Sequence, residues 1–367
     1  MIYLHVPFCK SFCAYCDFYS ELCPANESAR AQKLYADRVC AEIEARREEI
    51  ASSAGLRTLY VGGGTPSVLD IGLLEHIVRS LDAAPYEEFT LEVNPEDIVS
   101  KGRDYVRALL GLGVTRISMG IQSMDDGILR WMRRRHDSAQ AVEAVRILRD
   151  AGVGNLSLDL IFGLSQLGDA QWEDTLDRIL ALRPEHVSAY QLSIEAGSAL
   201  ADMVQRGTYT EAGEELCRHQ YDRLCGRLAE AGFHHYEISN FARPGFEAVH
   251  NSAYWRRLPY VGLGPGAHSF DGGRARSWNS ESLTDWQASR EILTERDETV
   301  EILMLGLRTD RGLPEAWLRT HCAADTLDAL VEEGALVRIR DGNGTDTRLR
   351  VPENRFFVSD DIIRALV

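Results

Sequence analysis

The stretch Met1–Ser20, MIYLHVPFCKSFCAYCDFYS, decides how the rest of the chain is interpreted. Residues 1–6 form a short run of mainly apolar, aromatic and β-branched residues that stops at a proline, which predicts a buried strand. Three cysteines then follow with the spacing C-x3-C-x2-C, namely Cys9, Cys13 and Cys16. Three thiolates on one tight loop can hold three irons of a [4Fe–4S] cluster. The fourth iron of such a cluster is open to a small molecule, and aromatic neighbours exclude water from it.

Other uses of three cysteines are weaker interpretations of this loop. A structural zinc site usually takes four ligands, often from two paired clusters, and the sequence contains no second C-x2-C. His5 or His136 could complete a lone zinc site, although neither spacing is typical of one. Three cysteines also pair badly as disulfides within one loop, and nothing in the sequence indicates export.

Composition limits the class of protein. The chain has 367 residues, of which 45% are hydrophobic, so one large domain and one small one can each bury a core. The formal net charge of −16 argues against nucleic acid as the main partner. There is no apolar run long enough to span a membrane, and the first apolar run is too short for a signal peptide. We therefore expect a cytoplasmic protein with no transmembrane segment, in a reducing compartment that suits an oxygen-sensitive cluster.

Strand-like and helix-like segments alternate through the first 192 residues. The alternation predicts parallel strands joined by right-handed crossovers. Six such units are fewer than the eight of a closed barrel, so we expect an α/β fold built as a partial (βα)6 barrel. The expected strands are 1–6, 57–61, 89–93, 116–121, 156–162 and 187–192, and the expected helices are 29–51, 71–81, 104–112, 139–151 and 172–182.

The pattern changes after the sixth unit. A helix is expected at 211–231 and a single strand at 233–241, followed by a stretch rich in Gly, Pro and aromatic residues. The chain then becomes helical from about residue 283, with helices at 299–307, 314–321 and 326–333 and a hairpin from 336–340 and 348–351. We expect residues 1–232 to form the barrel, 233–282 an extension, and 283–367 a small helical, winged-helix-like domain that serves for packing or partner contact.

Polar and glycine residues fall where several of the expected strands end, which is the functional end of a βα barrel. The run Gly62–Pro66, GGGTP, lets backbone approach a ligand closely, although a tight turn alone could also explain it. Glu92, Gln122 and Asp159 occupy comparable positions on later strands. One buried acid is usually structural, but four such features on consecutive strands predict a crevice that could hold an adenosine and a methionine moiety.

These segments resemble the HemN/HemW group of radical S-adenosylmethionine (SAM) proteins. The opening YLHVPFCKSFCAYCDF carries the resemblance, and GGGTPS, LEVNPE, ISMGIQS, MRRRH and LDLIFGLSQ extend it. The group contains oxygen-independent coproporphyrinogen III oxidases and heme chaperones. The oxidases typically carry a further cysteine two residues after the third, where this chain has Phe18, and this departure favours the chaperone branch.

The resemblance implies a [4Fe–4S] cluster and SAM as cofactors. The implied cluster ligands are Cys9, Cys13 and Cys16. The implied SAM contacts are Tyr3, Tyr15, Gly63, Gly64, Thr65, Glu92, Gln122, Arg134, Asp159 and Gln191.

A second motif, HNSAYW, occupies residues 250–255. Imidazole is a common axial ligand of heme iron, and Tyr and Trp can pack on a porphyrin. A single histidine beside two aromatic residues is more often a packed core residue. The resemblance, however, relates this stretch to the HNxxYW motif associated with heme binding, which implies heme contacts by His250, Tyr254 and Trp255. His268 in the following GLGPGAHSF is a second, weaker candidate ligand.

The resemblance implies a heme chaperone whose partners are heme, an acceptor hemoprotein and an electron donor. The alternative is an enzyme, an oxidase that decarboxylates coproporphyrinogen III by radical chemistry. A related radical SAM methyltransferase or heme-degrading enzyme is a third interpretation, against which HNSAYW argues. The sequence leaves open whether SAM is turned over or only bound.

Overall fold

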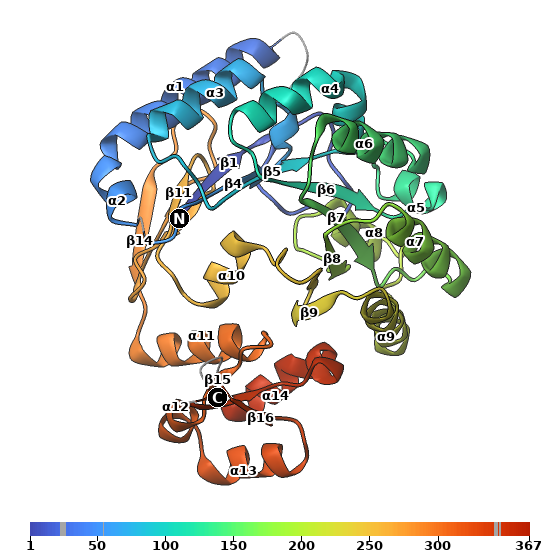
Figure 1. Ribbon diagram of the computed structural model, residues 1–367, viewed down its shortest axis with the longest axis vertical. Coiled ribbons are helices and arrows are strands. Elements are labelled where there is room, and N and C mark those ends of the chain that lie inside the picture. Colours follow the sequence, from blue (N-terminus) through green and yellow to red (C-terminus); the bar gives the residue numbers. More distant parts are fainter. Residues whose placement is uncertain (23–26, 54, 341–343, 345) are drawn as a thin grey trace.

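A curved, mostly parallel nine-stranded sheet forms the centre of the larger part of the molecule (Figure 1). The coordinates are a computed structural model, which describes residues 1–22, 27–53, 55–340, 344 and 346–367. The sheet has the order β11-β1-β4-β5-β6-β7-β8-β10-β9. Its six central strands run parallel, which confirms the predicted partial barrel. They are β1 (Ile2–Val6), β4 (Thr58–Gly63), β5 (Glu88–Val93), β6 (Arg116–Gln122), β7 (Leu156–Phe162) and β8 (His186–Gln191).

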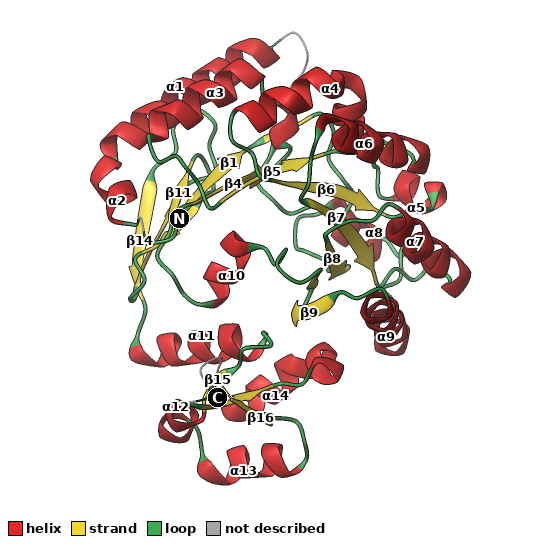
Figure 2. Cartoon of the chain, in the orientation of Figure 1, coloured by secondary structure: helices red, strands yellow, loops and turns green. Residues whose placement is uncertain are grey.

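Helices cover the convex face of this sheet (Figure 2). The helix α3 (Ile71–Leu81) illustrates why: Leu74, Ile77, Val78 and Leu81 recur at helical spacing and are buried, and the Asp70 carboxylate caps the first turn. Each fully buried aliphatic side chain contributes roughly 1.5–3 kcal/mol. The other covering helices are α1 (Ser28–Ala45), α4 (Pro95–Gly111), α6 (Ser138–Ala151), α7 (Asp169–Ala181) and α9 (Glu214–Glu230), with the short helices α2 (Arg47–Ser52), α5 (Asp126–Trp131) and α8 (Ala199–Gln205) between them.

Two helix predictions were wrong in extent. The helix expected at 104–112 begins nine residues earlier, where Pro95 supplies a preset first turn. Gly102, with φ +71°, interrupts the helical geometry and hides the continuous pattern. The helix expected at 29–51 is divided at Arg46 into α1 and α2.

The single strand expected at 233–241 was also wrong. The segment is a hairpin of β9 (His234–Glu237) and β10 (Asn240–Ala242), and β10 continues the sheet antiparallel to β8. In the sequence, polar residues alternate with Tyr236 and Ile238 from His235 through Ser239, across the turn, so the pattern alone does not reveal the reversal.

The HNSAYW motif forms most of a short helix, α10 (Val249–Trp255). Figure 1 shows α10 on the concave side of the curved sheet. The chain then adds β11 (Val261–Leu263) parallel to β1, at the sheet edge opposite β10. The segment 240–263 therefore connects the two edges of the open barrel and carries α10 across its interior.

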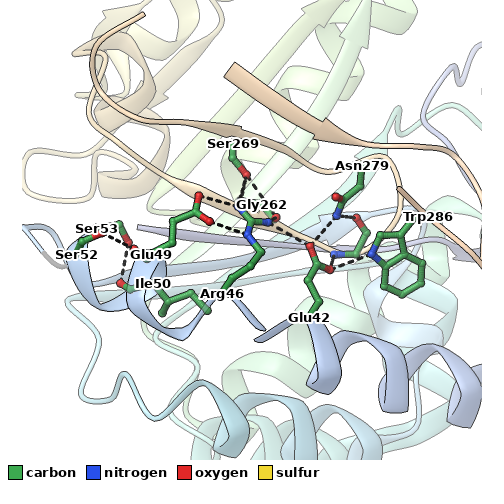
Figure 3. Close-up of polar contacts among 11 residues, drawn as sticks. Glu42, Arg46, Glu49, Ile50, Ser52, Ser53, Gly262, Ser269, Asn279 and Trp286 are labelled. Carbon is green, nitrogen blue, oxygen red and sulfur yellow. Dashed lines mark hydrogen bonds and ion pairs between the residues drawn. The ribbon is translucent and has the colours of Figure 1, made fainter. Parts of the chain in front are cut away.

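Polar contacts fasten this returning segment to α1 (Figure 3). Arg46 donates to the Gly262 carbonyl at 2.6 Å and to Ser269 Oγ at 2.9 Å. The Glu42 carboxylate accepts from the Gly264 amide, Asn279 Nδ2 and Trp286 Nε1. These contacts hold β11 and the small sheet of β12 (His268–Phe270), β13 (Ala275–Asn279) and β14 (Ala288–Ile292) against the barrel. The strand β14 corrects the expectation that the chain is helical from residue 283.

The C-terminal part combines helices with a three-stranded sheet, whereas the sequence predicted helices with the two-stranded hairpin alone. Its helices are α11 (Glu295–Leu307), α12 (Glu315–His321), α13 (Ala324–Glu332) and α14 (Ser359–Leu366). The strands β15 (Leu313–Pro314), β17 (Thr347–Arg350) and β16 (Val337–Arg340) pair in that order. Among the described helices, none is both long enough and apolar enough to cross a bilayer.

Candidate functional site: a polar cavity inside the partial barrel

The inner face of the barrel is polar, although its strands are buried. On β6, Arg116, Ser118, Gly120 and Gln122 line the interior, while the alternate residues Ile117, Met119 and Ile121 belong to the core. Parallel sheets covered on both faces are normally apolar on both. The polar face surrounds a cavity of about 420 Å³, called the barrel cavity below.

The three-cysteine loop closes one end of the barrel cavity. Cys9, Cys13 and Cys16 all line it. Protein contacts fix the loop: Lys10 Nζ lies 2.5 Å from the buried Asp97 carboxylate, and the amide of Ala14 donates to the Met132 carbonyl at 3.0 Å. The short strand β2 (Phe8–Cys9) also pairs with β3 (Glu21–Leu22). The cysteines are therefore held at the cavity by the fold itself.

The donor set fits an iron–sulfur cluster better than a single metal ion. Among the described residues, no three His, Cys, Asp or Glu side chains are close enough to bind one metal ion. The two histidines considered for zinc are engaged elsewhere: His5 Nε2 lies 2.9 Å from the Tyr19 carbonyl, and His136 Nε2 lies 3.1 Å from that of Ile121. A [4Fe–4S] cluster can be held by three thiolates of one loop, and all three cysteines line the same cavity.

Two polar side chains reach the thiol sulfurs. Thr65 Oγ1 lies 3.5 Å from Cys9 Sγ, and Arg134 Nη1 lies 3.4 Å from Cys13 Sγ. Donors to ligating sulfurs tune the potential of such clusters. Thr65 and Arg134 could therefore both position and tune a cluster bound here.

Glycines allow the turn at the end of β4 to lie against the cysteine loop. Gly63 has φ +112°, and a Cβ there would lie 2.7 Å from the His5 ring. A Cβ on Gly64 would lie 3.0 Å from the Phe8 carbonyl oxygen and 3.1 Å from Cys9 Sγ. The turn can approach the loop this closely because it carries no side chains.

Two acids lie on the cavity wall below this turn. Glu92 accepts from Tyr60 OH at 2.7 Å and from the Gly63 amide at 3.2 Å. Burial raises the pKa of Glu92 to about 7, although the hydrogen bond from Tyr60 lowers it. Asp159 accepts from Ser118 Oγ, and burial raises its pKa as well. Their carboxylates could accept hydrogen bonds from the hydroxyl groups of a ribose.

The end of β6 has an unusual backbone that places two more candidates. Gln122 has φ +69°, and the pairing of β6 with β7 shifts register between Gly120 and Gln122. Arg134 donates to the Gly120 carbonyl at 2.7 Å and to Asn94 Oδ1 at 2.6 Å. The distorted strand end and the arginine therefore form one wall of the cavity.

All but one of the ten residues implied to contact SAM line the barrel cavity. The exception is Tyr3, which packs behind Tyr60 with ring centroids 6.1 Å apart. The cavity also contains residues that were not predicted: Asn94, Arg116, Ser118, Ser188, Tyr190 and Asn251. Strict alternation of polar and apolar residues within the expected strands was the signal that could have found most of them.

The heme candidates lie beside the cavity and are engaged in other contacts. His250 is fully buried, with Nδ1 2.7 Å from Thr58 Oγ1 and Nε2 2.8 Å from Tyr254 OH. The Glu88 carboxylate accepts from the amides of Val249 and His250 at 2.8 and 3.0 Å. Burial lowers the pKa of His250 to about 3. The imidazole is therefore neutral, which is the form that binds iron.

The other aromatic candidates differ in position. Trp255 is half-buried at the end of α10, and His268 is exposed and stacks on Trp278. Neither residue lines the barrel cavity, whereas Asn251 of α10 does. Within α10, therefore, His250 and Tyr254 face a hydrogen-bonded core, and Asn251 contributes to the cavity wall.

A parallel partial barrel with three thiols and a polar cavity at one end defines a radical SAM protein. The model of the radical SAM superfamily matches residues 3–179. The structure of the coproporphyrinogen III oxidase HemN from Escherichia coli superposes with a TM-score of 0.78 at 19% identity, over 99% of this chain and 89% of that one, which shows a shared fold.

Curated relatives narrow the class further. The protein named heme chaperone HemW from Lactococcus lactis is 32% identical, covering 85% of this chain and 82% of the relative. The protein of that name from Mycobacterium tuberculosis is 32% identical over 100% of this chain and 94% of its own length. Radical S-adenosyl methionine domain-containing protein 1 from Bos taurus is 33% identical, covering 85% and 74%. The chain belongs to the HemW family of radical SAM proteins.

Proposed function

We propose that the chain is a heme chaperone that binds heme near α10, carries a SAM-ligated [4Fe–4S] cluster in the barrel cavity, and transfers heme to an acceptor hemoprotein. The observation that carries the proposal is His250, a neutral imidazole on a separate short helix beside the cavity. Its sequence context is the HNxxYW pattern, and the chain has Phe18 where the related oxidases carry a further cysteine.

The cavity residues have distinct tasks in this proposal. Cys9, Cys13 and Cys16 would hold the cluster, whose reduced form supplies the electron that cleaves a carbon–sulfur bond of SAM. Glu92 and Asp159 would orient the ribose of SAM by accepting hydrogen bonds from its hydroxyl groups. Phe12 and Phe18, both exposed at the cavity mouth, would exclude water from it.

Heme ligation by His250 requires one ring nitrogen to lose its partner, because Nδ1 is bonded to Thr58 of β4 and Nε2 to Tyr254 of α10 itself. Movement of α10 away from β4 would free Nδ1. Three hydrogen bonds join α10 to the barrel strands, one between His250 Nδ1 and Thr58 Oγ1 and two from the α10 amides to Glu88. At about 1–2 kcal/mol each, they amount to a few kcal/mol. A heme contact of micromolar intrinsic affinity, about 8 kcal/mol, exceeds that amount. Heme binding could therefore offset the loss of these three hydrogen bonds, called the latch below, while the burial of His250 and Ala253 adds to the cost of opening.

The test is a hemin titration of anaerobically reconstituted protein, followed through the Soret band. We expect one hemin per chain, with a changed Soret band and weaker binding in His250→Ala. His268→Ala should bind like the wild type, because His268 is exposed and stacks on Trp278 outside the barrel cavity. A Soret band and affinity unchanged in His250→Ala would remove His250 as the ligand.

A transfer experiment separates a chaperone from an enzyme. Hemin-loaded protein mixed with an apo-hemoprotein should give the acceptor's spectrum faster than hemin dissociates spontaneously from the loaded protein. The same reduced protein with SAM and coproporphyrinogen III should form no protoporphyrinogen. Formation of protoporphyrinogen at useful rates would contradict the chaperone assignment and favour the oxidase.

A further inference from the structure

Arg116 is a buried cation whose donors are not satisfied. It is the first residue of β6, its side chain is 1% exposed, and it lines the barrel cavity. Within the described part of the chain, its Nε and Nη1 atoms have no hydrogen-bond partner. A buried charge without partners is destabilising by several kcal/mol, so a fold that retains one has a use for it.

The neighbouring acids are committed to other groups. The Glu88 carboxylate accepts the two α10 amides, and Asp159 accepts from Ser118 Oγ. Glu92 is bonded to Tyr60 and Gly63. These acids contribute charge near the guanidinium, but the ligands that its N–H groups need must come from elsewhere.

The one anionic group of SAM does not reach Arg116 in the proposed function. That group is the methionine carboxylate, which in a SAM-ligated cluster would lie at the open iron, on the side of the cavity where Arg134 contacts Cys13. Arg134 contacts the Gly120 carbonyl, four residues along β6 from Arg116. Four residues of strand span about 13 Å, which is more than an arginine side chain covers.

The surroundings suit a second carboxylate that arrives from the side of α10. Asn251 of α10 and Ser118, Ser188 and Tyr190 of the barrel also line the cavity and carry polar side chains. The Arg116 charge also acts on His250 and contributes to its lowered pKa. A guanidinium with free donors binds a carboxylate in a bidentate manner.

We propose that Arg116 is a carboxylate-binding residue that receives a propionate of heme when α10 opens. This inference rests on the proposed function and adds to it the group that recognises the two acidic arms of the ligand. Release of α10 removes Asn251 from the cavity wall and exposes the guanidinium on the side where His250 would meet the iron. SAM would continue to occupy the opposite end, near the cysteines.

The test compares hemin with its dimethyl ester, in which both propionates are masked, in one detergent-containing buffer. Wild-type protein should bind hemin at least about tenfold more tightly than the ester, because a buried charge-assisted pair contributes about 1.5–3 kcal/mol. Arg116→Met should bind the two ligands equally, and Arg116→Lys should retain an intermediate preference. Arg103→Met, an exposed arginine on α4 outside the cavity, is the control and should keep the full preference.

Each result decides the inference. Equal affinity of the wild type for hemin and the ester would overturn it while leaving heme binding intact, and so would an undiminished preference in Arg116→Met. Should Arg116→Met fail to fold, the wild-type preference and its reduction in Arg116→Lys decide the same question. Absence of any hemin binding would defeat the proposed function itself. Binding of sodium propionate at Arg116 without discrimination between hemin and ester would assign the site to small carboxylates and overturn the heme assignment.

Discussion

At the scale of single residues, Glu92 combines burial with a role at the cavity wall. Its pKa of about 7 lies above the usual value of 4.5, mainly because of burial. The unfolded chain therefore loses this proton near pH 4.5, whereas the folded chain holds it until about pH 7. The contribution of Glu92 to stability is full below pH 4.5 and is lost as the pH rises through 7.

Glu92→Gln should therefore stabilise the ligand-free protein more at pH 8 than at pH 4.5. A shift of this size corresponds to about 3 kcal/mol of unfolding free energy at most. Urea unfolding at both pH values measures the difference. The control is Glu75→Gln, an exposed glutamate on α3, which reports the general effect of removing one negative charge. A difference between Glu92→Gln and wild type that does not grow with pH would contradict the assignment.

A substitution at Gly64 tests the close approach of the turn after β4 to the cysteine loop. Ala at this position would place its Cβ 3.0–3.1 Å from the Phe8 carbonyl oxygen and Cys9 Sγ. Accommodating it by shifting the loop costs about 1–3 kcal/mol. Gly64→Ala should therefore hold less iron and sulfide after reconstitution than wild type. Gly154→Ala, where a Cβ meets nothing within 4 Å, should load normally, and equal loading of both variants would refute the argument.

At the scale of secondary-structure elements, α10 is held by contacts that a matched pair of threonines can test. Thr58 Oγ1 is bonded to His250, whereas Oγ1 of Thr90, on the neighbouring strand β5, has no partner among the described residues. Thr58→Val removes about 1 kcal/mol from the latch, which increases the open population about fivefold. Hemin should then associate about fivefold faster than with wild type or Thr90→Val, as measured by stopped-flow absorbance. Equal rates in the two valine variants would show that the latch does not limit binding.

The elements that the sequence predicts best are those with a simple period. The six parallel strands and most of the covering helices were confirmed because each has one apolar side that faces the core. The predictions failed where local chemistry interrupts the period, as at Gly102 in α4 and at the turn between β9 and β10. The helix α10 went unpredicted because its seven residues are too short to show a period.

The sequence predicted only part of the cavity lining. Residues at strand ends, such as Glu92 and Gln122, stand out in the sequence because they interrupt apolar runs. Arg116 lies at the start of a strand, and Asn251 reaches the cavity only through the return of the chain across the barrel. Their contribution depends on long-range packing, which no local pattern encodes.

At the scale of the whole molecule, the attachment of the returning segment to α1 determines where α10 lies. Glu42 accepts hydrogen bonds from Gly264, Asn279 and Trp286, which follow the returning segment 240–263 in the chain, and it also pairs with Arg46. Glu42→Gln keeps the shape but loses the charge, so we expect a loss of about 1–3 kcal/mol in unfolding free energy. Faster hydrogen exchange should be confined to β11, β13 and neighbouring peptides. Glu44→Gln, an exposed change on the same helix, should leave these peptides unchanged, and equal exchange in both variants would contradict this role for Glu42.

The most direct test of the account concerns the vacant ligand position of the cluster. Protein reconstituted anaerobically with ⁵⁷Fe is examined by Mössbauer spectroscopy with and without SAM. We expect a four-iron cluster in which SAM alters the signal of one iron and leaves those of the three cysteine-bound irons in place. A spectrum unchanged by SAM, or a protein that holds no such cluster, would contradict it.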